Sequence, residues 1–319
     1  MLHSRHACLR RMAQQYAPTL VVNERLPANP ETFLQAFQVG LSTAHLQRLF
    51  SSTIHKDMQK QLIALTTQPQ QRARLLSLAH KNPFPNLDPS DPLTRLHNEA
   101  VVINSRLHLG MPASALAAAD PRARCICGKL LSEDIFHFGA CRFFKGQQIA
   151  CHDGGINAIV RSLVACGITP NLEHKFADTQ KRVDISWVCQ QTGAKQHIDF
   201  TVCNPAASSV ATAVKLDSMT AMRPLQAREN AKCTRHTAAS NAEGYSFYPW
   251  VVDPFGSTTQ TARKLVKQAV TTAAVYGSAS APNEKQFLAR IAASVYLGTA
   301  AIYSAGLGSA NIHATQQHL

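Results

Sequence analysis

The sequence predicts an α/β fold with a mixed sheet flanked by helices. Two strand-like runs, residues 182–190 and 195–203, are separated by a short turn that contains a glycine. A third strand-like run, residues 244–252, follows a segment with helical texture. Helical periodicity also precedes the first strand, at residues 154–167, and follows the third, at residues 258–276 and 283–303. This order of helix, strand, strand, helix, strand and helix is typical of a layered α/β domain.

The N-terminal part has a different texture. Apolar residues recur three and four positions apart at residues 33–50 and 55–68, which predicts helices. Four prolines at residues 83–92 exclude a continuous helix there. Residues 93–110 predict one amphipathic helix that ends at Gly110 and Pro112. We therefore expect a helical region at 1–82, a proline-rich linker with an amphipathic helix at 83–120, a Cys/His-rich unit at 121–150, the α/β domain at 151–310 and a tail at 311–319.

The composition favours a polyanionic partner and an intracellular location. The 319 residues carry a formal net charge of +13, and 45% of them are hydrophobic, enough for a substantial core. Nine cysteines are an odd number and are unevenly spaced, which favours metal binding over disulfides. The N-terminal residues lack the apolar stretch of a signal peptide, so secretion is not expected. Residues 291–310 are uncharged but rich in Ala, Gly and Ser, which predicts a buried helix instead of a membrane span.

A compact Cys/His cluster precedes the predicted sheet. Three thiols and one imidazole within seventeen residues form the ligand set of a closed, structural zinc site. Gly128, directly after the second cysteine, allows the tight turn that such a site needs. Cys151 and His152 are reserve ligands, and scattered buried cysteines are the alternative interpretation. The predicted zinc ligands are Cys125, Cys127, His137 and Cys141.

Two aspartates lie in apolar surroundings on the two predicted arms of a hairpin. Asp184 and Asp199 would be costly to bury without a cation. Carboxylates from adjacent strands can share Mg²⁺, which prefers oxygen ligands and supports phosphodiester cleavage. Glu173, which we expect at the end of the preceding helix, is a candidate third acid. The alternative is that the aspartates cap turns or pair with nearby cations, namely Lys181, Arg182 or Lys195.

Six short motifs together resemble a known family. They are CICG with HFGAC, the CHD that opens a helix, KRVD, IDFTVCNP, ARENAK and GYSFYPWVVDPFG. Their order and spacing from about Leu93 to Ala301 are similar to the C-terminal region of site-specific non-LTR retrotransposon polyproteins. In that region a zinc knuckle precedes a restriction-enzyme-like endonuclease of the PD-(D/E)xK superfamily. The helical part that contains SRLHLGMP resembles the segment between polymerase and knuckle.

The resemblance implies a restriction-endonuclease-like fold and Mg²⁺-dependent nicking of double-stranded DNA. Asp184 and Asp199 would be the metal-binding aspartates. Standard members place a lysine two residues after the second acid, where this chain has Thr201. The retrotransposon branch moves the lysine to the following helix, where Lys232 matches best and Lys215 is the alternative.

The chain departs from the family pattern at three positions. Val183 stands where many members have proline, His236 where a tyrosine is usual, and Cys151 where an arginine is often found. A polymerase signature of the Y/F-x-D-D kind is missing from the sequence. We therefore expect a fragment or remnant of such a polyprotein, with a reverse transcriptase supplied by another chain and element RNA as a further partner.

Three functions compete at this level. The first is a DNA endonuclease in the nucleus; the second is a catalytically inactive zinc-containing nucleic-acid-binding module; the third is a structural α/β protein with a zinc staple. Basic residues close in sequence to the Cys/His cluster and to Asp184 favour the two nucleic-acid-related functions, the endonuclease and the binding module. The candidate nucleic-acid contacts are Arg142, Lys145, His152, Lys181 and Arg182.

Overall fold

The computed structural model divides the chain into two units, residues 1–67 and 68–319. It describes residues 61–79, 87–114, 120, 122–177, 181–189, 193–207, 223–275 and 281–316. The predicted helix at 33–50 and the first part of the one at 55–68 lie outside these residues, and residues 61–65 are helical. The second unit contains α4 (Pro69–Ala79), α5 (Asn98–His108), η2 (His137–Ala140), η3 (Arg142–Phe144), α7 (Lys145–Ala165), β1 (Asn171–Lys175), β2 (Arg182–Val188), β3 (Lys195–Val202), α9 (Arg223–Ala242), β4 (Ser246–Val252), α10 (Gln260–Val275) and α11 (Glu284–Gln316).

A mixed sheet forms the centre of the second unit. Its order is β1-β2-β3-β4, in which the pairs β1–β2 and β2–β3 are antiparallel and the pair β3–β4 is parallel. The predicted α/β class, with a mixed sheet flanked by helices, is confirmed. The sequence prediction missed β1, because this edge strand is polar and mostly exposed and lacks the apolar alternation by which strands are recognised.

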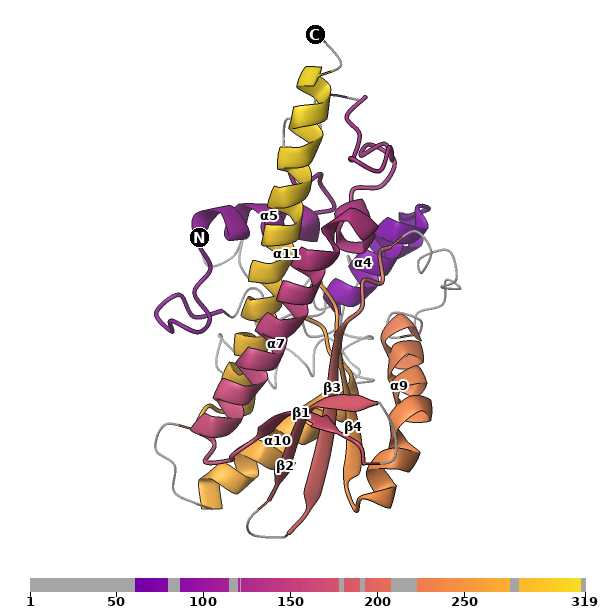
Figure 1. Ribbon diagram of the computed structural model, residues 1–319. Coiled ribbons are helices and arrows are strands. Elements are labelled where there is room, and N and C mark those ends of the chain that lie inside the picture. Colours follow the sequence, from indigo (N-terminus) through magenta and orange to yellow (C-terminus); the bar gives the residue numbers. More distant parts are fainter. Residues whose placement is uncertain are drawn as a thin grey trace, which may run out of the picture. The chain divides into compact units, whose positions relative to one another are not determined.

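Helices cover both faces of the sheet (Figure 1). Ile185, Trp187, Ile198 and Phe200 project from β2 and β3 into a core shared with α7, α10 and α11. On the opposite face, α9 packs along β4 and over the polar residues of β3. One face of the sheet is therefore apolar. On the other face, buried polar side chains contact helix α9.

Helix α9 is the connection between the parallel strands β3 and β4. The sequence predicts a helix over 211–237 that breaks at Pro224, whereas the described helix begins at Arg223. Proline is compatible with a first helical turn because no intrahelical bond is lost there. Gly244, with a φ of 76°, reverses the chain from α9 into β4, which a residue with a Cβ would do only at a cost.

Helix α7 begins at Lys145, earlier than the expected residue 154. It therefore crosses residue 150, the boundary expected between the Cys/His-rich unit and the α/β domain. Its early turns, KGQQIACHD, have little apolar periodicity, and their burial comes from contact with α11. Residues on both sides of the expected boundary consequently share one rigid element.

Helices α7 and α11 run antiparallel in close contact, because Cys151 lies against Gly298 and Gly154 against Ser294. A Cβ on Gly298 would lie 2.8 Å from the Cα of Cys151. By length and apolar composition, residues 284–310 of α11 could cross a membrane, but more than half of this stretch is buried inside the protein. The prediction of a buried terminal helix is confirmed.

Replacing Gly298 should destabilise the fold. In Gly298→Ala the new methyl meets the backbone of α7, so the helices must move apart at a cost of about 1–3 kcal/mol. The matched control is Gly308→Ala in the same helix, where a Cβ meets open space and helix propensity gains up to about 1 kcal/mol. Urea denaturation should therefore give opposite shifts of the midpoint. Equal midpoints for both variants would show that the close approach contributes nothing.

Candidate functional site

A loop directly before α7 gathers the four Cys/His side chains. Cys127 Sγ lies 3.0 Å from His137 Nε2, and Cys125 Sγ lies 3.7 Å from Cys141 Sγ. The four potential ligand atoms all lie within 4.8 Å of one another. Burial raises the pKa of Cys125 to about 12, so a thiolate there requires a nearby cation. This cluster could hold a metal ion such as zinc.

The backbone around the first two cysteines explains their close spacing. The amide of Gly128 donates to the carbonyl of Cys125 (2.7 Å), and the amide of Cys125 donates to the carbonyl of Lys129 (2.9 Å). Gly128 has a φ of 87°, a conformation that favours glycine, as the sequence predicted. The two reserve ligands lie elsewhere: Cys151 packs against α11, and His152 contacts Asp184.

The two aspartates come together across the β2–β3 hairpin. Asp184 belongs to β2 and Asp199 to β3, both line one hollow, and each carboxyl group influences the pKa of the other. Oδ2 of Asp184 also accepts a hydrogen bond of 2.6 Å from the amide of Phe200. The main chain of β3 thus fixes the orientation of the carboxyl group on the neighbouring strand.

Lys232 reaches this pair from α9. Its Nζ donates to Asp199 Oδ2 (2.6 Å) and to the carbonyl oxygen of Phe200 (3.2 Å). Both charged side chains are nearly buried, at 13% and 12% exposure, so each compensates the cost of burying the other. The alternative lysine, Lys215, lies outside the described residues.

His236 is a neighbour of the pair that sequence reasoning did not assign. It lies one helical turn after Lys232, and its Nε2 is 3.3 Å from Asp199 Oδ2. Burial lowers the pKa of His236 to about 4, so the ring is neutral at pH 7. The four-residue spacing from Lys232 is the signal that could have indicated a shared helix face.

The electrostatics of the two acids differ. Burial raises the pKa of Asp199 to about 6, although Lys232 opposes this effect. Burial also acts to raise the pKa of Asp184, but hydrogen bonds from His152 and the Phe200 amide outweigh it, so this pKa is lowered. The hydrogen bond to Asp184 is also the main reason why the pKa of His152 rises to about 9. At pH 7 the site therefore pairs an imidazolium with Asp184, while Lys232 donates a hydrogen bond to Asp199.

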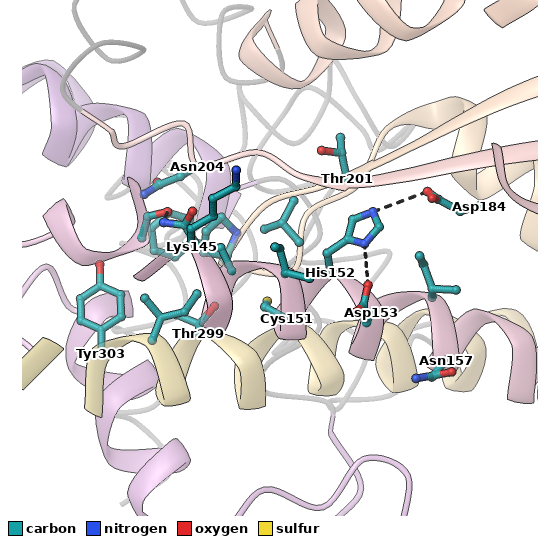
Figure 2. A pocket seen from close by; sticks show the side chains of 18 of the residues that line it. Lys145, Cys151, His152, Asp153, Asn157, Asp184, Thr201, Asn204, Thr299 and Tyr303 are labelled. Carbon is teal, nitrogen blue, oxygen red and sulfur yellow. Dashed lines mark hydrogen bonds and ion pairs between the residues drawn. The ribbon is translucent and has the colours of Figure 1, made fainter. Parts of the chain in front are cut away.

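The acid pair lies beside two hollows. The larger has a volume of about 690 Å³, and Figure 2 shows His152 projecting from α7 into it between Asp184 and Asp153. Nδ1 of His152 lies 3.1 Å from Asp153 Oδ1, and Nε2 lies 3.5 Å from Asp184 Oδ2. The smaller, about 380 Å³, is lined by Lys175, Lys181, Arg182, Asp184, Asp199, Lys232, Arg235 and His236. Asp184 lines both hollows, so ligands in either could reach it.

Glu173 does not lie where the sequence led us to expect. It belongs to β1 instead of the end of the preceding helix, and its exposed carboxylate pairs with Arg182 at 3.3 Å. It lines the larger hollow together with Asp184. As a left-handed residue with a φ of 53°, it marks a local distortion of β1.

The remaining candidate nucleic-acid contacts are divided between the two hollows, apart from Arg142, which lines neither. Lys145 and His152 line the larger hollow, Lys181 lines the smaller, and Arg182 lines both. Arg142 is exposed and stacks over the ring of Phe143 at 5.2 Å. Two further bases of the smaller hollow, Lys175 and Arg235, were not identified from the sequence.

Zinc removal should unfold the loop before α7. Cys141→Ser should release the ion, because serine is a poor zinc ligand, and should lower the melting temperature of the protein. Elemental analysis and thermal unfolding would measure both effects. Cys233→Ser, a half-buried cysteine on α9, is the control and should keep its zinc. An unchanged zinc content in Cys141→Ser would exclude Cys141 as a ligand.

No protein-family model matches the chain, and no curated protein matches it. The acid pair, its lysine and the Cys/His cluster are the features of this chain that indicate a function.

Proposed function

We propose that the protein is a metal-dependent endonuclease that nicks double-stranded DNA. The observation that carries the proposal is the convergence of Asp184, Asp199 and Lys232 at one basic hollow. Two acids and a lysine brought together from two strands and a helix form the constellation expected of a restriction-endonuclease-like site. We further propose that the described sheet and helices are a variant of that fold, from a fragment or remnant of a non-LTR retrotransposon polyprotein acting in the nucleus.

The donor set at the acid pair fits Mg²⁺. Two carboxyl groups face the hollow, and the Phe200 carbonyl oxygen lies beside them within reach of Lys232 and His152. Oxygen ligands are those that Mg²⁺ prefers. Asp184 and Asp199 would hold the ion, which supplies charge stabilisation at the cleaved phosphate and lowers the pKa of an attacking water.

Lys232 has a third N–H donor that can take part in the reaction. An ammonium group carries three N–H donors, of which Asp199 and the Phe200 carbonyl each accept one. The third can orient a water molecule or donate to a phosphate oxygen as negative charge develops. Asp199 thus positions the lysine in addition to its part in binding the ion.

His152 has the complementary task of holding Asp184. As an imidazolium it donates from both nitrogens, and its Nε2 lies near both Asp184 and the Phe200 carbonyl. The exposed bases around the smaller hollow can bind the flanking phosphates of a duplex. Their contribution to affinity should fall as salt is added, because bound phosphates release counterions.

Removing either acid should abolish nicking. Asp184→Asn and Asp199→Asn keep the shape of the side chain but remove the charge, and Lys232→Met removes the donor. Each should slow the conversion of supercoiled plasmid into nicked circles by about 100-fold or more, the loss typical when a group that stabilises the transition state is removed. Activity should also require Mg²⁺ and disappear with EDTA.

The matched control is Glu284→Gln, an exposed acid in the first turn of α11, which should nick like the parent. Glu173→Gln tests whether the third acid contributes. If the Asp184 and Asp199 variants cut as fast as the parent, the assignment is wrong. Intact plasmid that is nevertheless retarded on a gel would favour the inactive nucleic-acid-binding module.

DNA affinity should depend on the bases of the smaller hollow. The double variant Lys175→Ala/Arg235→Ala should bind more weakly and reduce the slope of log K against log salt by about 2. Lys264→Ala/Lys267→Ala removes the same charge from exposed positions of α10, on the other face of the sheet. Fluorescence anisotropy should show a change in the first variant alone. Equal losses in both would indicate only a general charge effect.

A further inference from the structure

A second group of metal-ligating side chains lies on the face of the sheet that α9 covers. His174 belongs to β1, His197 to β3, and Glu243 follows the last residue of α9. Their potential ligand atoms lie within 4.8 Å of one another. His174 Nε2 lies 2.6 Å from Glu243 Oε2, and the two imidazole centroids are 4.5 Å apart.

His197 is the member of this group that most needs a partner. The residue is fully buried, and its Nδ1 lies 3.1 Å from the hydroxyl oxygen of Ser240. Its Nε2 is buried and has no hydrogen-bond partner within the described ranges. Such a nitrogen costs about 1–3 kcal/mol when left unsatisfied. A metal ion at this point would satisfy it, because a ring nitrogen without a proton is a ligand.

The surrounding groups orient the potential ligands. Ser240 fixes one nitrogen of His197, and Glu243 Oε1 accepts a hydrogen bond of 2.9 Å from the amide of Ala177. The ring of Tyr245 stacks on His197 with 3.8 Å between centroids. Outer hydrogen bonds of this kind fix the ring orientation and tautomer of metal-binding histidines.

The chemistry of the group selects a class of ion. Two imidazoles and one carboxylate suit zinc and other first-row transition ions, whereas Mg²⁺ prefers an all-oxygen site. The ligand set also differs from the three thiols and one imidazole of the Cys/His cluster. The two groups would therefore be distinguishable by spectroscopy.

We propose that His174, His197 and Glu243 form a second metal site, which binds Zn²⁺. The ion joins β1, β3 and the segment that follows α9. The same helix carries Lys232 and His236, so the site holds the helix that delivers them to Asp199. The proposal concerns metal binding alone and does not depend on the nuclease assignment.

Zinc stoichiometry of the full chain tests the proposal. The parent should retain about two zinc ions, one in each site. Glu243→Gln and His174→Gln should each lose about one, while circular dichroism verifies that the fold persists. His174 is partly exposed, so His174→Gln should disturb the fold little. If Glu243→Gln does not fold, the zinc content of His174→Gln tests the site. Glu284→Gln is the control and should retain both ions.

Cobalt substitution assigns each ion to its site. Co²⁺ bound at the Cys/His cluster should show thiolate-to-cobalt charge transfer, which Cys141→Ser removes and Glu243→Gln leaves intact. Ser240→Ala alters no ligand and should weaken binding at the second site by about 10–100-fold. Asp199→Asn should keep both zinc ions.

Three results would overturn the proposal. The first is a parent that binds one zinc ion; the second is unchanged stoichiometry in both Glu243→Gln and His174→Gln. The third is loss of the second ion in Asp199→Asn, which would place it at the acid pair. Unaltered affinity in Ser240→Ala would contradict the orienting role of that hydroxyl.

Discussion

Parallel pairing of β3 with β4 is the constraint on which both polar clusters of the sheet depend. A parallel pair cannot be joined by a tight turn, so the chain must cross over the sheet between the two strands. The described part of that crossover is α9. The crossover starts at β3 and returns to the neighbouring strand β4, so α9 lies over β3. The helix and the residue that follows it therefore place Lys232 beside Asp199, Ser240 beside His197 and Glu243 beside His174.

The main chain of Phe200 is the second organising element. Its amide donates to Asp184, and its carbonyl oxygen accepts from Lys232 and lies 3.2 Å from His152. Its ring is buried in the core on the opposite face, against Gly155 of α7. Packing of the apolar core therefore fixes the backbone groups to which the charged side chains are bound. The geometry of the site therefore depends on the main chain of β3 as well as on the two aspartates.

Much of this arrangement follows from local sequence patterns. The hairpin strands, β4, α10 and α11 were predicted because their apolar residues recur with a regular period. The acids were identified from their apolar strand context and Lys232 from the family resemblance, and the structure brings them together. Glu173 was misplaced because the polar strand that contains it has no such period. His174 and His197 gave no local signal, since they lie on different strands and their partner Glu243 is far away in sequence.

Helix α7 links the Cys/His cluster to the acid pair without an intervening hinge. It begins four residues after Cys141 and contains His152 within its second turn. The rise from Lys145 to His152 is about 10 Å, or roughly three nucleotide steps of a duplex. Under the proposed nuclease function, DNA bound at the Cys/His cluster and cleaved at the acid pair would be held at two points joined by this one helix. The distance between the bound sequence and the nick would then be set by helix length, and inserting one helical turn would move the nick.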